Sequence, residues 1–261
     1  MPLRPAPRPV RSPARHSALA TVAGLLLLVT GCTTVGTPSA DLADDGRELT
    51  AAELRAAALT DGDLGPGYIV TVMTPGHGET GPADGREVTD VPACQPVLDA
   101  VTPAGPAGQG GGPAAETDLS VARATDPKGS VYAGLLGYRP GRAGELQTRV
   151  EQVLAGCGSF TSTTAGVRGA PATRKGVPAR HRLSRLDTPT TGGADAVTGF
   201  TLTNESGGVT LTQRALLARV GSVLAVFSTV GVGAEPATAP DERVVRQQVA
   251  KLRAAQRAAR P

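Results

Sequence analysis

Histidine, serine and glycine are spaced along the chain in ways that complete no catalytic or cofactor-binding motif. No serine after residue 31 sits in G-x-S-x-G, and neither H-E-x-x-H nor a Walker A sequence occurs. Residues 76–81 match G-x-G-x-x-G, but Pro82 follows where a nucleotide-binding helix would have to begin. His77 and His181 have no Cys, Ser or carboxylate pair at motif spacing, so we interpret both as solvated or packing residues. We therefore expect no catalytic residue and no cofactor.

A basic cluster is the densest charged feature, because no acidic residue lies between positions 159 and 186. We interpret it as a solvated edge; contact with anionic lipid headgroups, a wall polymer or an acidic partner is the alternative. In a strand, Arg180 and Arg182 would share one face, and His181 and Arg185 the other. The cluster, a candidate anionic-contact patch, consists of Arg168, Arg174, Lys175, Arg180, Arg182 and Arg185.

Residues 1–31 have the order of a removable export signal. An Arg-rich start is followed by the apolar or small residues 18–30 and a small-residue cleavage site. That apolar segment is shorter than the roughly 20 residues of a spanning helix. The string Val29-Thr30-Gly31-Cys32 resembles the bacterial lipobox, which implies a diacylglycerol on the Cys32 thiol and cleavage just before it. We expect a lipid anchor on the outer face of the cell membrane; an ordinary secretory signal is the alternative.

Two further cysteines remain once Cys32 carries lipid. Exported thiols oxidise, so we predict that Cys94 and Cys157 form a disulfide, with two buried free thiols as the alternative. A tetrahedral metal site is disfavoured. Neither cysteine has C-x-x-C spacing, and only His77 and His181 follow the signal.

Charge and composition exclude two classes of partner. The chain has 26 basic and 23 acidic residues, and four of the basic residues lie in the signal, which leaves 22 against 23. A polybasic nucleic-acid binder is therefore not expected. Aromatic residues make up 2% of the chain with no Trp, which argues against stacking platforms for bases or sugars.

Three helices are predicted from capping and periodicity, and a short fourth over 94–101 is predicted from the Pro near its start. Thr50 and Glu53 form a capping box for a helix that should end at the turn 61–63. Apolar residues recur on one face of 145–157, and residues 241–259 close the chain as an amphipathic helix.

Strands are predicted in the middle and last thirds, with Gly221-Ser222 as a two-residue hairpin turn. The expected architecture is α+β: one domain, residues 50–261, with an antiparallel twisted sheet flanked by helices, behind a flexible tether of residues 32–49. The predicted strands are 67–73, 116–125, 130–139, 179–186, 196–203, 209–220 and 223–230.

Several segments together resemble a known family. The pattern Leu54-x4-Leu59-Thr60-x3-Leu64-Gly65-Pro66-Gly67-Tyr68 is similar to the "LLT…DLPPGY" opening of many actinobacterial lipoproteins. The helix end 154–160, which contains Cys157, and the stretch 217–224 fit the same group. Together they resemble the PknH-like extracellular domain, the sensor module of a mycobacterial receptor kinase and its lipoprotein relatives, over about residues 50–257.

The resemblance implies a strongly twisted antiparallel sheet with a cleft for an unidentified ligand, and it supplies no catalytic residues. This chain departs from the kinase sensor in two ways. It carries no kinase or transmembrane segment, so we expect any signalling to need a partner. It also has one Cys pair where the kinase sensor has two bridges, so we expect looser loops.

Three functions follow as hypotheses. The leading one is a non-catalytic, membrane-tethered ligand-binding or sensor lipoprotein whose partner is a small ligand or another envelope component. The alternatives are an envelope-acting hydrolase that uses carboxylates no motif reveals, and a carrier of an apolar or lipid ligand. A dry cavity of several hundred cubic ångströms would favour the carrier. Two convergent carboxylates, or His181 paired with an acid, would favour the hydrolase.

The anchor makes a direct prediction. Replacing Cys32 by Ser removes the only thiol that the lipobox offers, so lipidation should be lost and the precursor should stay uncleaved by the lipoprotein peptidase. Metabolic labelling with radioactive palmitate measures this. Equal label in the Cys32→Ser variant and the parent would show that the anchor is wrongly assigned.

Overall fold

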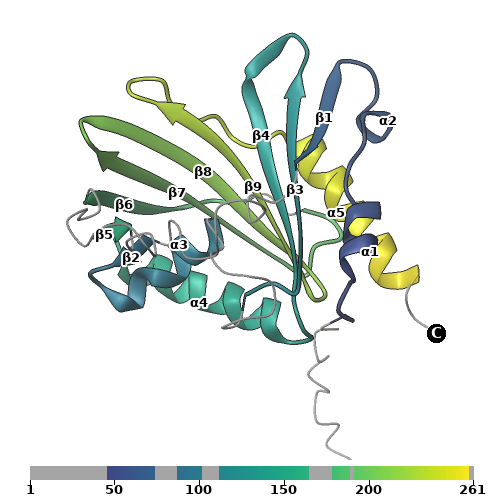
Figure 1. Cartoon of the computed structure of the whole chain (residues 1–261), viewed down its shortest axis with the longest axis horizontal. Coiled ribbons are helices and arrows are strands. Elements are labelled where there is room, and N and C mark those ends of the chain that lie inside the picture. Colours follow the sequence, from purple (N-terminus) through teal and green to yellow (C-terminus); the bar gives the residue numbers. More distant parts are fainter. Residues whose placement is uncertain (1–45, 74–86, 102–111, 165–177, 189–190, 259–261) are drawn as a thin grey trace, which may run out of the picture. The chain divides into compact units, whose positions relative to one another are not determined.

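One antiparallel sheet of nine strands organises the protein. The computed structural model describes residues 46–73, 87–101, 112–164, 178–188 and 191–258, all within one compact unit, Ala40–Pro261. The strand order is β1-β3-β4-β9-β8-β7-β6-β5-β2, and every neighbouring pair is antiparallel (Figure 1). The strands are β1 (Tyr68–Met73), β2 (Glu87–Thr89), β3 (Ala115–Arg123), β4 (Asp126–Gly137), β5 (Ser159–Thr164), β6 (Ala179–Leu186), β7 (Ala196–Ser206), β8 (Val209–Val220) and β9 (Val223–Val232).

Helices cover both faces of this sheet, so the fold has three layers. The helices α1 (Ala51–Ala56) and α5 (Glu242–Ala258) pack on one face, against β3, β4, β8 and β9. The helices α3 (Gln95–Val101) and α4 (Arg142–Gly156) pack together, and α4 lies on β6, β7 and β8. The α+β sheet architecture expected from the sequence is confirmed.

The central strands β8 and β9 divide their side chains between two cores. Leu216 and Phe227 belong to the core beneath α1 and α5, whereas Leu217 and Val226 belong to the core beneath α3 and α4. Because successive strand residues point to opposite faces, a strand that is apolar at every position must be covered on both sides. The continuous apolar run in β9 is therefore the sequence signal for the third layer.

The hairpin between β8 and β9 forms as predicted. Val220 pairs with Val223, which leaves Gly221 and Ser222 as the turn. Gly221 has a φ of 58°, in the left-handed region that glycine adopts without strain.

The first helix begins where the capping box places it, but it ends earlier than expected. The Thr50 hydroxyl accepts from the Glu53 backbone N–H, and the Glu53 carboxylate accepts from the Thr50 N–H. The helix stops at Ala56, and the predicted turn at 61–63 is instead a one-turn helix, α2 (Asp61–Leu64). A second capping pair explains it, because the Asp63 carboxylate accepts from the backbone N–H and hydroxyl of Thr60.

The domain starts a few residues before the boundary drawn from the sequence. Leu49 is fully buried in the core beneath α1 and α5. The Arg47 carbonyl accepts hydrogen bonds from Ser222 and from Gln256 of α5. Residues 46–49, predicted as tether, therefore belong to the domain; residues 1–45 lie outside the described part of the chain. Within that described part, no helix is long and apolar enough to cross a membrane.

Cys94 and Cys157 are joined by a disulfide, with their Cα atoms 5.9 Å apart. Cys94 ends a 3₁₀ turn (Pro92–Cys94) that leads into α3, and Cys157 follows the last residue of α4. Both cysteines are buried in the core that these helices cover. The bridge closes a sequence separation of 63 residues, so it restricts the unfolded chain strongly.

Stability should depend on this bridge. Reduction, or Cys157→Ala, should lower the free energy of unfolding by about 2–5 kcal/mol, the usual range for a native disulfide. In a domain of this size even 2 kcal/mol corresponds to roughly 4–8 °C in Tm, measured by thermal circular dichroism. The Cys32→Ser variant keeps the bridge and is the control. Maleimide labelling of both thiols in the unreduced native protein would contradict the assignment.

Candidate functional site

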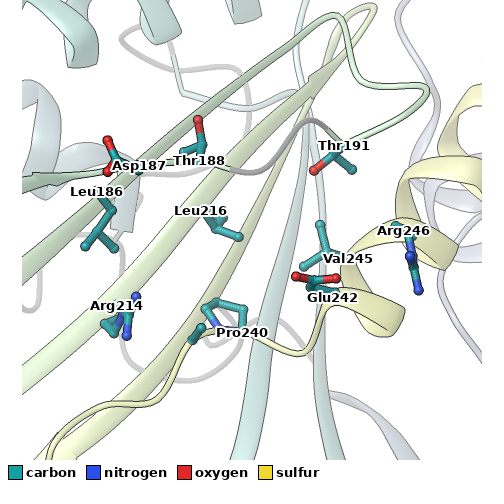
Figure 2. Close-up of a pocket in the computed structure, with 11 residues that line it drawn as sticks. Leu186, Asp187, Thr188, Thr191, Arg214, Leu216, Pro240, Glu242, Val245 and Arg246 are labelled. Carbon is teal, nitrogen blue, oxygen red and sulfur yellow. The ribbon is translucent and has the colours of Figure 1, made fainter.

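A pocket of about 480 Å³ lies between the first turn of α5 and strands β6 and β8 (Figure 2). Its lining combines aliphatic side chains with hydroxyl and charged groups, the composition of small-molecule sites. The residues are Leu186, Asp187, Thr188, Thr191, Arg214, Leu216, Ala239, Pro240, Glu242, Val245 and Arg246.

Strand register builds the floor of the pocket. Leu186 of β6 pairs with Gly199 of β7, and Gly199 pairs with Leu216 of β8, so the three form one row across the sheet. A Cβ atom at Gly199 would lie 2.6 Å from the Thr188 methyl and 3.0 Å from a Leu216 methyl. The missing side chain at Gly199 is thus what lets Thr188 and the two leucines approach across β7.

The first turn of α5 forms the opposite wall, and Asp241 fixes where that helix begins. Its carboxylate accepts from the backbone N–H of Arg243 at 2.8 Å and from the Tyr68 hydroxyl at 3.0 Å. Arg123 donates to the same carboxylate and sits over the Tyr68 ring. Burial raises the pKa of Asp241, but these hydrogen bonds outweigh it and the net pKa is lowered. The helix start that presents Glu242 and Val245 is therefore held by charge as well as packing.

Farther along the same helix, Lys251 ties α5 to α2. Its ammonium lies 2.7 Å from the Asp63 carboxylate and also donates to the Ala58 carbonyl. The hydrogen bond from Lys251 is the largest cause that lowers the pKa of Asp63 to about 2.

The carboxylates of the pocket do not converge. Asp187 and Glu242 stand on opposite walls, and Figure 2 shows the Asp187 carboxylate pointing away from Glu242 and Arg214. Both residues are exposed to solvent. A general acid and base acting on one bond must both reach it, so this pair does not supply that arrangement.

A second polar cluster is buried where β2, β5 and β6 adjoin. The Ser162 Oγ lies 2.7 Å from the His181 Nε2, and both residues are only 1% exposed. His181 also stacks on Phe160, with ring centroids 4.7 Å apart. The interpretation of His181 as a packing residue agrees with this burial, but its serine partner was not anticipated from the sequence.

Glu87 sets the direction of the hydrogen bonds in this cluster. Burial raises the pKa of Glu87, and a hydrogen bond from the Ser162 hydroxyl partly opposes that rise. Because the hydroxyl has one proton and gives it to Glu87, we assign the shared proton of the other bond to His181 Nε2. The His181 Nδ1 then has no hydrogen-bond partner among the described residues.

This serine–histidine pair does not offer an activated nucleophile to a substrate. With the proton assigned to Nε2, the imidazole donates to Ser162, whereas in a catalytic pair the imidazole accepts the serine proton. The Ser162 Oγ is also covered, so an attacked carbon could not approach it in this conformation. The described residues contain no group of three or more His, Cys, Asp or Glu that could hold a metal ion.

The predicted basic cluster is only partly within the described residues. Arg180 and Arg182 are exposed on one face of β6, while His181 and Leu183 are buried on the other, as strand alternation predicted. Arg182 lies 3.4 Å from Glu205, and Arg185 lies 3.6 Å from Glu151, so these two charges are largely compensated within the fold. Arg168, Arg174 and Lys175 lie outside the described residues, as do Cys32 and His77.

Comparison with known proteins adds little to this geometry. No protein-family model matches the chain, and no curated protein matches it. A solved structure of an uncharacterised Mycobacterium smegmatis protein, the Rv0999 ortholog, is 13% identical, with a TM-score of 0.39. That alignment covers 81% of this chain and 99% of the other. A similarity this weak carries neither function nor site residues across.

The buried histidine should make stability depend on pH. Burial lowers the pKa of His181, although the nearby Asp90 charge partly opposes this. Below the ordinary histidine pKa of about 6.5, the unfolded chain binds a proton that the folded protein excludes. The free energy of unfolding should therefore decrease as the pH is lowered below about 6.5. Urea unfolding between pH 5 and 8 measures this, and a His181→Gln variant should show a flatter profile. Parallel profiles would contradict it.

A Ser162→Ala variant separates titration from the loss of a hydrogen bond. It removes the acceptor of the Nε2–H, so it should lower stability at every pH by about 1–3 kcal/mol while keeping the slope below pH 6.5.

Proposed function

We propose that the chain is a lipid-anchored binding protein on the outer face of the cell membrane, which holds a small ligand without transforming it. The observation that carries the proposal is the pocket at the start of α5. Its volume of about 480 Å³ falls within the range of small-molecule sites, roughly 300–1,000 Å³. An aliphatic floor with a few charged and hydroxyl groups at its rim suits a ligand with both apolar and polar parts.

Features of the sequence support the location and the kind of protein. The lipobox at Cys32 supports the anchor, and the disulfide fits an oxidising compartment outside the cytoplasm. A PknH-like sensor module would need a cleft for its ligand, and the pocket supplies a place for one. The finer assignment to that family stays part of this proposal.

The two alternative functions fit the described residues less well. For the carrier alternative, an apolar or lipid ligand, the charged lining by Arg214 and Glu242 disfavours a purely apolar molecule and leaves only a lipid with a polar group. A hydrolase would need convergent carboxylates or an accessible nucleophile, and the pocket carboxylates diverge while Ser162 is covered. Binding a ligand without transforming it requires only the pocket and its lining, which the described residues provide.

Native mass spectrometry of the protein purified from its own membranes tests the proposal. The parent should retain a small molecule, and Ala239→Trp should lose it, because Ala239 lines the pocket and an indole there would fill it. Ala234→Trp changes an exposed alanine of the same β9–α5 connection outside the lining and should retain the ligand. Retention by the filled variant, or no bound mass in any of the three proteins, would contradict the proposal.

A further inference from the structure

We infer that Arg214 recognises a negative charge on the ligand, so that the pocket takes an amphiphile with one anionic group on an apolar body. This inference rests on the proposed binding function and names the chemistry of its ligand. Arg214 lies on β8 two residues before Leu216, on the same face of the sheet, and lines the pocket.

No carboxylate neutralises Arg214 from within the sheet. Its cross-strand partners are Thr201 of β7 and Thr229 of β9, and the next residue on its own face of β8 is Thr212. The Nε atom is buried and has no hydrogen-bond partner among the described residues. No ion pair of this guanidinium occurs within that part of the chain.

Among the described arginines that are at least partly buried, the others each pair with a carboxylate. The Nε atoms of Arg47 and Arg142 also lack a partner in that part of the chain, but their terminal nitrogens pair with Glu53 and Glu145. Arg219, also on β8, lies 3.8 Å from Asp195, and Arg253 of α5 is paired with the same carboxylate. A buried guanidinium N–H without an acceptor costs free energy, and because Arg214 lines the pocket, an anionic ligand there would bring an acceptor to its guanidinium. A carboxylate, sulfonate or phosphate matches the planar fork of arginine.

The remaining charges of the pocket do not cancel this preference. Glu242, Asp187 and Arg246 are exposed, so water screens them strongly. In Figure 2 the Asp187 carboxylate points away from Arg214, and Arg246 belongs to the α5 wall, across the pocket from Arg214. Arg214 is therefore the charge that a bound molecule would meet at the floor of the pocket.

Aliphatic groups define the rest of the ligand. Beside Arg214 the floor continues through Leu216 and Leu186, and Val245 faces them from α5. An anionic group at Arg214 would place the rest of a molecule over this row. The recognised class is thus an apolar body with one negative group at its end.

Two dyes of nearly the same shape test the inference. Anilinonaphthalene sulfonate has an apolar aromatic body with one sulfonate, and N-phenylnaphthylamine is the same body without the charge. Fluorescence titration should show that the parent binds the sulfonate dye more tightly than the neutral one. Arg214→Met should weaken the sulfonate dye by about ten-fold to a hundred-fold and change the neutral dye by less than about two-fold.

Matched variants keep the two proposals distinguishable. Arg149→Met removes an exposed arginine of α4 and should leave both affinities unchanged. Ala239→Trp should weaken both dyes, and binding of both at parental affinity to that variant would overturn the pocket itself. If Ala239→Trp loses both dyes while Arg214→Met still prefers the sulfonate dye, the pocket is the binding site but Arg214 does not recognise the anionic group.

Competition then identifies the source of the anionic amphiphile. Displacement of the sulfonate dye by dissolved decanoate supports a free single-chain ligand, and displacement only by phosphatidylglycerol vesicles supports a bilayer lipid. Displacement by neither would overturn the assigned class.

Discussion

The rest of the structure depends on the alternation of side chains along β8 and β9 between two buried faces. Leu216 and Leu217 are neighbours in the chain, yet they belong to different cores. Neither face of the central strands can be left in water, so one set of helices must cover each side. The disulfide holds α3 to the end of α4 on one face of the sheet, and the contacts of α5 hold the helices on the other face.

That width produces the pocket. A single helix, α5, lies on β8 and β9, while Gly199 of β7 and Leu186 of β6 lie farther across the same face. The row of Leu186, Gly199 and Leu216 continues past the edge of the helix, so an apolar floor emerges from beneath its first turn. The pocket is therefore a consequence of partial coverage of one face, with Asp241 fixing the position of its helical wall.

Local signals in the sequence predicted most of the helices and strands but not which strands pair or which helices pack on them. Periodicity located α4, and the capping box located the start of α1, because both depend on residues within one turn of each other. The strands β5 and β2 were missed. Their residues, such as Ser162 and Thr89, are polar and small, and they become strand only by pairing with each other and with β6.

The candidate site escaped prediction for the same reason. Arg214, Leu186 and Glu242 are far apart in the sequence and match no motif; register and helix docking bring them together. The basic cluster of residues 168–185 stands out in the sequence through its charge density, which is a local quantity. The informative feature of Arg214 is instead that its partners across β7 and β9 and its same-face neighbour on β8 are all threonines, and only the register reveals it.

The two ends of α5 make different contacts. The Arg47 carbonyl is bound by Gln256 in the last turn of α5, whereas Glu242 in its first turn lines the pocket. A helix of 17 residues separates these ends by about 25 Å. The pocket therefore lies at the opposite end of α5 from residues 46–49, where the described part of the domain begins.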